Sequence, residues 1–428
     1  MTRATRIVLR AATMASDMAA VWSRSGLVLI AILIAGAAIR LAAIAAGPGY
    51  PFDVVTFQRW AARMAAGGPA SFYDPALFAD YPPGLLYLLW PLGALPGGPP
   101  PEIVRAIGIP FDLAIAVVAF AVVRRLRGDR AGLVAAAAYG LDPAPALAGP
   151  YWGQVDAVAV LPLILSLVAA AAGRSALAGA LGAVAALVKP QLAVGLATLF
   201  VAWATRAVRR GERGALARLV GGAAATALVI ALPFGLTVEK IAAIVRDATS
   251  THPFSSLFAF NVWALVTGFA VPDDTTILGL PARVWGLGLV AIAFALVWAR
   301  TAALAASGRG PFPDELALLL AMTTLATLAL YELPTRIHER YFLPAVALLV
   351  PFAFASRRAA FAYVVFSVVL AVSVLFAFTH QEQTGVRATP VLERTLFDPS
   401  LLVLLVLAGF GACAGLVSLW VPRRPSLA

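Results

Sequence analysis

The sequence predicts an all-α polytopic membrane protein, a transmembrane helical bundle of about 11–13 spans of which some are short or broken. Of the 428 residues, 61% are hydrophobic and only 12% are charged. Apolar runs of about 20 residues, enough to cross a ~30 Å hydrocarbon layer, recur from residue 26 to residue 420. Basic residues gather in short clusters that flank these runs. The net charge of +11 therefore reflects membrane topology, and no nucleic-acid partner is expected.

The chain is expected to form one membrane domain. Residues 1–25 are basic and precede the first apolar run, so they should form a cytoplasmic N-terminal segment. Residues 26–428 should form a single polytopic domain. The basic clusters, assigned to the cytoplasm, leave three outer loops at about 47–80, 237–281 and 379–398. We therefore expect a multi-pass protein of the cytoplasmic (inner) cell membrane, in contact with membrane lipid.

Two segments do not fit a regular span. Residues 81–97 hold four prolines and are barely long enough to cross. A full crossing there would place the basic cluster at 124–130 outside, against the charge rule, so a partial or re-entrant crossing is expected. Residues 176–205 carry Lys189 and Pro190 in their middle. This pattern predicts two short half-spans with a break between them, the kind of broken helix that lines a cavity.

The first outer loop predicts a short helix with a carboxylate at its start. Val54, Phe57, Trp60 and Met64 recur at helical spacing. They indicate an amphipathic interfacial helix, with Trp60 at the level of the lipid headgroups. Asp53 stands just before the first turn, where it is either a helix N-cap or a general base held at the membrane surface.

Four further polar residues interrupt the apolar pattern. Asp80, late in the same loop, is a second candidate for the acid. Gln154 and Asp156 stand at the mouth of a span, where they either face a cavity or form a buried hydrogen-bond network. Lys189 lies in the middle of an apolar run and needs an anion there, either Asp156 or the phosphate of a ligand.

The densest polar cluster outside the basic flanks is at residues 335–341. Arg336 and Arg340 offer two guanidinium groups for a phosphate, and His338 can donate to the same group. Glu339 and Tyr341 are expected to support them. The alternative is a charged helix end in which Glu339 pairs internally with one of the two arginines.

No metal site or cofactor is expected. The sequence has no zinc-binding or nucleotide-binding motif, and its three histidines are far apart. His252 and His380 are therefore interpreted as loop residues without a specific role.

Several motifs together resemble one enzyme family. Read in chain order, they are FDVVTFQRWA and YPPGLLYLL in the first outer loop, then WGQVDA, AALVKPQ, FAFNVWAL and RIHERYFLPA. In this order they resemble the GT-C fold integral membrane glycosyltransferases, and most of all the bacterial relatives of the glycosylphosphatidylinositol mannosyltransferases. The resemblance extends from about residue 26 to residue 420.

The resemblance implies a function. It implies transfer of a sugar, mannose above all, from a polyprenyl-phosphate donor at the outer face of the membrane, with inversion. Asp53 would be the base for the acceptor hydroxyl, and the stretch from His338 to Tyr341 would lie near the donor phosphate. Because Asp53 has no acidic neighbour, no metal requirement is expected. The acceptor, a glycan, a lipid or a protein, is left open.

The chemistry of such a transfer agrees with the residue types. The leaving phosphate needs stabilisation of its charge more than it needs a general acid, and Arg336, Arg340 and Lys189 are the candidates to supply it. Two alternatives use similar ligands: a transporter or flippase of lipid-linked sugars, and a polysaccharide polymerase or ligase. A transporter is expected to show inverted repeats, and none is visible in the sequence.

Overall fold

The computed structural model describes residues 24–74, 77–353, 355–421 and 424–427. In these residues, eight helical segments are long and apolar enough to cross a membrane, which confirms an all-α, multi-pass protein. They are α2 (Arg24–Ala45), α5 with α6 (Pro101–Arg127), η3 with α11 (Pro190–Arg210), α12 with η4 (Arg213–Phe234), α15 (Ala282–Ala306), α16 (Phe312–Glu332), α18 (Arg357–His380) and α20 (Pro399–Trp420).

The predicted 11–13 spans included short or broken ones, and the other apolar segments are short. They are α9 (Asp156–Ala171), α10 (Ser175–Val188), α7 (Asp129–Gly140) and α17 (Leu343–Leu349), the last followed by the 3-10 turn η6 (Val350–Phe352). A helix rises about 1.5 Å per residue, so each of these is shorter than a ~30 Å hydrocarbon layer.

The remaining elements are small. The helices are α3 (Pro51–Gly67), α4 (Leu86–Gly93), α8 (Pro143–Ala146), α13 (Val238–Ser250), α14 (Val262–Val266) and α19 (Pro390–Arg394). The tight turns are η1 (Pro69–Ser71), the π-turn η2 (Leu147–Tyr151), η5 (Glu339–Phe342) and η7 (Glu382–Thr384). Strand β1 (Ser256–Leu257) pairs in parallel with β4 (Ile337–His338), and β2 (Thr276–Ile277) pairs antiparallel with β3 (Leu280–Pro281).

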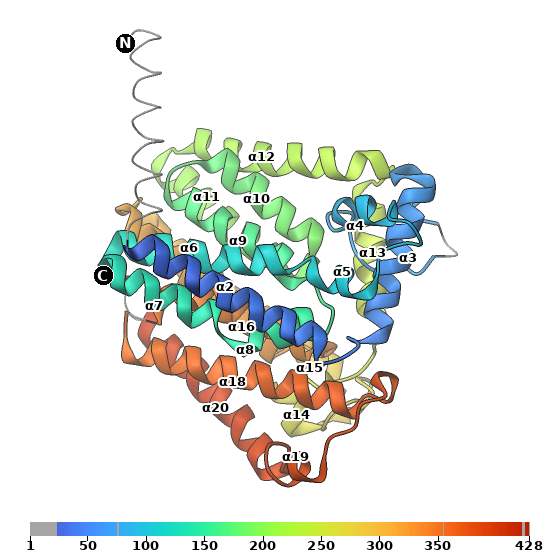
Figure 1. Ribbon diagram of the computed structural model, residues 1–428. Coiled ribbons are helices and arrows are strands. Elements are labelled where there is room, and N and C mark those ends of the chain that lie inside the picture. The colour runs from blue at the N-terminus through green and yellow to red at the C-terminus, as the bar shows by residue number, and fades with distance from the viewer. Residues whose placement is uncertain (1–23, 75–76, 354, 422–423, 428) are drawn as a thin grey trace.

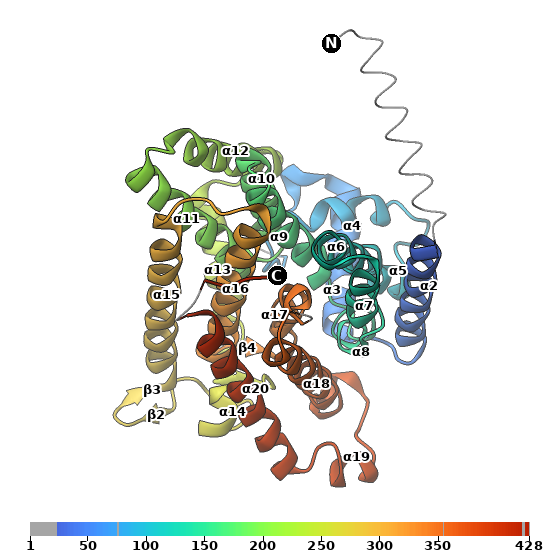
Figure 2. The ribbon, with the colours of Figure 1, turned by 90° about the vertical axis from the view of Figure 1, so that its left-hand side faces the viewer.

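The helices surround a central pair. In Figure 2, α16 and α17 lie near the middle, between α15 on one side and α2, α6 and α7 on the other. In the most apolar stretch of α16, 83% of the residues are buried, whereas in that of α12 only 11% are. A helix that is apolar on all sides is stable when neighbours cover it or when lipid does, so α16 forms the protein core and α12 faces lipid.

Helices α2, α6, α7 and α18 run across Figure 1, and α3, α4 and α13 lie at the right-hand end, opposite the C-terminus. At the C-terminal end, the hydroxyl of Ser25 donates to Asp129, and Arg127 donates to the carbonyl oxygen of Leu427 over 3.3 Å. The basic cluster at 124–130 therefore lies at the end where α2 begins. With eight residues, α4 does not cross, and the conflict with the charge rule disappears.

The predicted break between the two half-spans occurs at Lys189. Helix α10 ends at Val188, Pro190 opens η3, and α11 starts at Ala193. A proline cannot donate the helical hydrogen bond and disfavours helical backbone in the residue before it. The carbonyl oxygen of Leu187 accepts a hydrogen bond from the amide of Gly84 over 2.9 Å, so the first loop closes against the break.

Helix α3 is the helix expected in the first loop, but its apolar side faces the protein. Trp60 is 1% exposed, and its indole N–H donates to the carbonyl oxygen of Phe78 over 2.8 Å. Val54, Phe57 and Met64 are buried with it. Trp60 therefore does not lie among the lipid headgroups: α4 and the rest of the loop cover the side of α3 that the sequence pattern assigned to the membrane interface.

Candidate functional site

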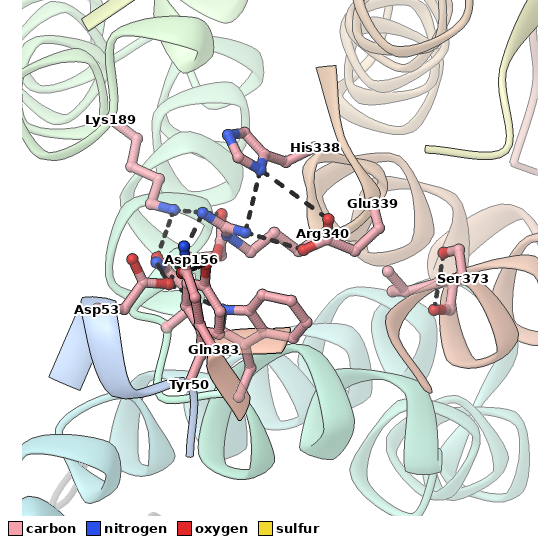
Figure 3. A network of polar contacts seen from close by, with 12 residues as sticks. Tyr50, Asp53, Asp156, Lys189, His338, Glu339, Arg340, Ser373 and Gln383 are labelled. Atoms are coloured by element: carbon pink, nitrogen blue, oxygen red, sulfur yellow. Dashed lines mark hydrogen bonds and ion pairs between the residues drawn. The ribbon is translucent and has the colours of Figure 1, made fainter. Parts of the chain in front are cut away.

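A cavity of about 800 Å³ lies at the end of the bundle that carries α3 and α13. Its walls come from all three predicted outer loops and from the break after α10. Six predicted site residues line it: Asp53, Asp80, Arg336, His338, Arg340 and Tyr341. Figure 3 shows the side chains of Asp53, Lys189 and Arg340 pointing toward one another.

Asp53 is not the N-cap of its helix. Pro51 opens α3, Tyr50 is the N-cap without a side-chain hydrogen bond, and Asp53 lies within the first helical turn. Its Oδ2 accepts from Trp152 Nε1 over 2.8 Å and from Gln154 Nε2 over 2.5 Å. Among the described residues, Oδ1 has no hydrogen-bond partner. One carboxylate oxygen is thus fixed by donors, and the other is open to the cavity that the residue lines.

The turn that carries Trp152 and Gln154 is rigidly held. Gly153 has φ +103°, and an added Cβ would lie 2.7 Å from Val54 Cγ2, so only glycine fits. The carbonyl oxygen of Trp152 accepts from the amide of Tyr50 over 2.5 Å. The guanidinium of Arg105 is buried and donates to main-chain carbonyls, with 2.9 Å to Pro150 among them. These contacts fix the donors that hold Asp53.

Lys189 is buried and forms an ion pair with Asp156. It is 1% exposed, and its Nζ lies 2.8 Å from Asp156 Oδ1 and 3.1 Å from Gln154 Oε1. Of the two anions that the sequence allowed, the ammonium takes Asp156, because a buried charge needs a buried partner. These contacts place Lys189 behind Gln154 and do not favour the predicted role in binding the donor phosphate, which stays a prediction.

Arg340 is the cation nearest to Asp53. Its Nη2 lies 3.8 Å from Asp53 Oδ2, and its Nη1 donates to Glu339 Oε1 over 2.8 Å. The guanidinium carbon lies 5.3 Å from the centroid of the Trp152 ring. Burial alone would lower the pKa of Arg340, but Asp53 and Glu339 raise it well above its usual range. The side chain is therefore a permanent positive charge on the cavity wall.

His338 and His252 lie against each other on the cavity wall, with ring centroids 5.3 Å apart. Burial lowers the pKa of His338 well below its usual value, and the charge of Arg340 lowers it further. Burial also lowers the pKa of His252. Both rings are neutral at neutral pH, so each donates one N–H. His338 is consequently a hydrogen-bond donor and not a resident acid, and His252, expected to have no role, is part of the site.

The side chain of Arg336 pairs with Asp273, a partner that the sequence did not predict. Its Nε lies 2.6 Å from Asp273 Oδ2, and its Nη1 donates to the carbonyl oxygen of Thr249 over 2.9 Å. The backbone of Arg336 is left-handed, with φ +66°. Each of the two predicted phosphate arginines pairs with a buried carboxylate, Arg336 with Asp273 and Arg340 with Glu339. They differ in position: Arg336 ties α13 to the segment before β4, whereas Arg340 also lies beside Asp53.

Asp80 and Tyr341 complete the predicted set. Asp80 lines the cavity, and its carboxyl has no side-chain partner in the described part of the chain. Burial raises the pKa of Asp80 to about 6, opposed by its own backbone N–H and reinforced by Asp53. Tyr341 also lines the cavity, and its ring centroid lies 5.8 Å from both Lys189 Nζ and the guanidinium carbon of Arg340. Its ring therefore lies beside both cations.

Sequence reasoning missed some residues of the site. Trp152 stands in the quoted WGQVDA motif, and this adjacency to Gln154 was the available signal for its contact with Asp53. Tyr50 and Gln383 contact each other across the cavity mouth, and they come from different loops. Asp273 reaches Arg336 only through the folded second loop, so no local pattern could have indicated it.

Within the described ranges, no group of three or more histidine, cysteine, aspartate or glutamate side chains is placed to hold a metal ion. No family model matches the chain, and no curated protein is significantly similar to it. The case for a function therefore depends on the geometry of the cavity and on the sequence motifs.

Proposed function

We propose that the protein is a membrane glycosyltransferase that moves a sugar from a polyprenyl-phosphate donor to an acceptor hydroxyl. The observation that carries the proposal is the arrangement of Asp53. Oδ2 is held by Trp152 and Gln154, and Oδ1 is open to a cavity at one end of a membrane helix bundle. A carboxylate fixed in this way is suited to take a proton from a hydroxyl group.

In the proposed reaction, the acceptor oxygen attacks the anomeric carbon of the donor sugar while Asp53 Oδ1 takes its proton. The bond from that carbon to the phosphate oxygen breaks, and its electron pair leaves with the lipid phosphate. A single displacement of this kind inverts the anomeric centre. Arg340 stabilises the charge that develops on the phosphate, and neutral His338 adds an N–H donor.

The residues favour a lipid-phosphate donor. Of the arginines that line the cavity, Arg340 lies beside the base, where its charge matches a single phosphate, and the cavity lies at the end of helices that face lipid. From the sequence resemblance, we infer polyprenyl-phosphate mannose as the donor, used at the outer face of the cytoplasmic membrane.

The test uses purified protein in liposomes with polyprenyl-phosphate mannose and a panel of acceptors. We expect release of free polyprenyl phosphate together with a glycosylated acceptor. Asp53→Asn should reduce the rate about 10²–10⁴-fold while donor binding persists, because the amide cannot act as a base. Asp74→Asn, an exposed acid in the same loop, is the matched control and should transfer normally.

Two outcomes would contradict the proposal. Movement of the intact lipid-linked sugar across the bilayer without cleavage would indicate a transporter or flippase. Transfer by Asp53→Asn at the wild-type rate would show that the base is another residue.

A further inference from the structure

The first loop supplies an acidic side of the cavity and the loop after α16 a cationic side, and the two meet where Arg340 lies 3.8 Å from Asp53. Asp53 and Asp80 lie on segments of the first loop, whereas Arg340 and His338 come from the loop after α16. A phosphate is attracted to the cationic side and repelled by ionised carboxylates. The acidic side is therefore the natural place for the other substrate, the acceptor.

Asp80 has unused hydrogen-bonding capacity on this side. It lines the cavity, and among the described side chains none forms a hydrogen bond or ion pair with its carboxyl. A carboxyl group accepts at both oxygens when ionised and also donates when protonated. With its pKa raised to about 6, mainly by burial, Asp80 exists in both forms near neutral pH, and each form binds hydroxyl groups. In the proposed reaction Asp53 takes the proton, so Asp80 is free to hold a second hydroxyl.

Two aromatic rings stand next to these carboxylates. Phe52 precedes Asp53 in the chain, and Phe78 is two residues before Asp80. The rings are 44% and 42% exposed, their centroids are 5.6 Å apart, and both line the cavity. The backbone of Phe78 is fixed by the hydrogen bond that its carbonyl oxygen accepts from Trp60. The acidic side thus offers apolar ring faces beside hydrogen-bonding carboxyls.

Aromatic rings beside carboxyl groups favour one of the three acceptor classes, which are a glycan, a protein and a lipid. A sugar ring has an apolar C–H face for contact with aromatic rings and adjacent hydroxyls on its edge for two carboxyls. A serine or threonine side chain supplies only one hydroxyl, which serves Asp53 and leaves Asp80 without a partner. A lipid alcohol supplies one hydroxyl and an alkyl chain.

We propose that Phe52, Phe78 and Asp80 form the acceptor subsite and that the acceptor is a saccharide. The sugar ring lies against the two phenylalanines, Asp80 holds one hydroxyl, and a neighbouring hydroxyl is presented to Asp53 Oδ1. This inference rests on the proposed function, because it assigns the donor to the Arg340 side of the same cavity.

The test measures binding without donor, by saturation-transfer NMR on the full chain in nanodiscs. The probes are methyl α-mannopyranoside, N-acetylthreonine amide and 1-hexanol. Methyl α-mannopyranoside should bind more tightly than the other two. Asp80→Asn and Phe78→Ala should each weaken its binding about tenfold, the effect of losing one charged hydrogen bond or one ring contact. Phe78→Trp should retain binding, which separates loss of the ring face from loss of fold.

Two matched controls lie outside the cavity. Phe361→Ala removes an exposed ring on α18, and Asp74→Asn removes an acid from the same loop as Asp80. Both should bind the mannoside like the wild type. The subsite is wrong if the threonine amide or hexanol binds at least as tightly, or if Asp80→Asn and Phe78→Ala bind normally.

Different results would contradict the proposed transferase and the proposed acceptor subsite. Donor cleavage is measured in the same preparations with polyprenyl-phosphate mannose. If mannoside binding depends on Asp80 but no donor is cleaved, the transferase is wrong and so is the acceptor role of the subsite. If donor is cleaved and mannoside binding ignores Asp80 and Phe78, only the subsite is wrong.

Discussion

The side-chain amide of Gln154 donates to Oδ2 of Asp53 over 2.5 Å. The other end of the same amide accepts from Lys189 over 3.1 Å. An ammonium group can only donate, so Lys189 requires the oxygen of Gln154 on its side and turns the N–H toward Asp53. Asp156 in turn holds Lys189. A buried ion pair thus orients the candidate base through one intervening amide.

The first prediction concerns the stability of this ion pair. Lys189→Met should lower the free energy of unfolding by about 3–5 kcal/mol, because it leaves the carboxylate of Asp156 buried without a cation. The double variant Lys189→Met/Asp156→Leu should regain most of that loss, since no charge is left unpaired. Thermal unfolding in nanodiscs measures both.

Turnover separates orientation from stability in the same variants. The double variant should remain impaired in transfer, because the oxygen of Gln154 then loses its ammonium donor and keeps only the hydroxyl of Tyr81, so the amide is held less firmly against Asp53. Donor binding should be unaffected, since Lys189 is buried behind Gln154 and does not itself line the cavity. A double variant with wild-type stability and wild-type turnover would show that the ion pair is structural only.

The second prediction distinguishes the two arginines of the 335–341 cluster. Arg340→Lys should weaken the binding of polyprenyl phosphate about tenfold or more, because a lysine cannot reproduce the forked contacts of a guanidinium. Arg336→Lys should leave that affinity nearly unchanged, since the Arg336 guanidinium is held by Asp273 and the carbonyl oxygen of Thr249 and does not lie beside Asp53.

Asp273→Asn provides the control for this comparison. It should resemble Arg336→Lys in a lowered melting temperature, because both break the link between the second loop and β4. Fluorescence titration with polyprenyl phosphate measures the affinity. The assignment is contradicted if Arg336→Lys loses more affinity than Arg340→Lys.

The sequence was sufficient for the fold class and for the long spans. Apolar runs such as 359–378 and 401–420 correspond to α18 and α20, because the length of a span is a local property of the chain. The break at Pro190 followed from proline geometry. The apolar side of α3 was also recognised, but whether lipid or protein covers an apolar side depends on tertiary packing, which no local pattern reveals.

Only part of the site was predicted, because contacts between distant chain segments depend on tertiary packing. The requirement of Lys189 for an anion follows from its burial in an apolar run, and it narrowed the partner to Asp156 or a ligand. The choice between the two depended on the distance between chain segments. The pairing of Arg336 with Asp273 could not be predicted from residue spacing. The two residues lie in different segments, which come together where β1 pairs with β4.

The third prediction is a pH dependence of stability that depends on Asp80. Its pKa is raised from 3.8 to about 6 in the folded protein, so the folded state keeps a proton that the unfolded state releases. The stabilisation is present below pH ~4 and is lost as the pH rises through about 6. Its size is at most about 3 kcal/mol, since one pKa unit corresponds to about 1.4 kcal/mol.

Melting temperatures of the wild type and Asp80→Asn, measured from about pH 4 to about pH 7, check this sign. The wild type should lose stability across the interval relative to Asp80→Asn, whose amide does not titrate. Asp74→Asn should keep the wild-type slope. Parallel curves for wild type and Asp80→Asn would show that Asp80 does not retain its proton on folding.

The last prediction concerns the close packing of α10 on α12, the helix pair that leads to the Lys189 break. A Cβ added at Gly179 would lie 1.9 Å from the carbonyl oxygen of Leu219, and one added at Gly222 would lie 2.0 Å from that of Ala176. Both clashes are with backbone, which cannot rotate away as a side chain can. Membrane helices that approach this closely require small residues at the contact.

Gly179→Ala should therefore separate the two helices and lower the melting temperature. Gly221→Ala is its control, because a Cβ there meets no atom within 4 Å and alanine favours the helix by up to about 1 kcal/mol. The two substitutions add the same methyl group to the same helix pair and should act in opposite directions. Equal effects on the melting temperature would show that α10 and α12 are not in this close contact. If Gly179→Ala also lowers turnover, the packing of α10 on α12 holds the Lys189 break, and with it Gln154, in register with Asp53.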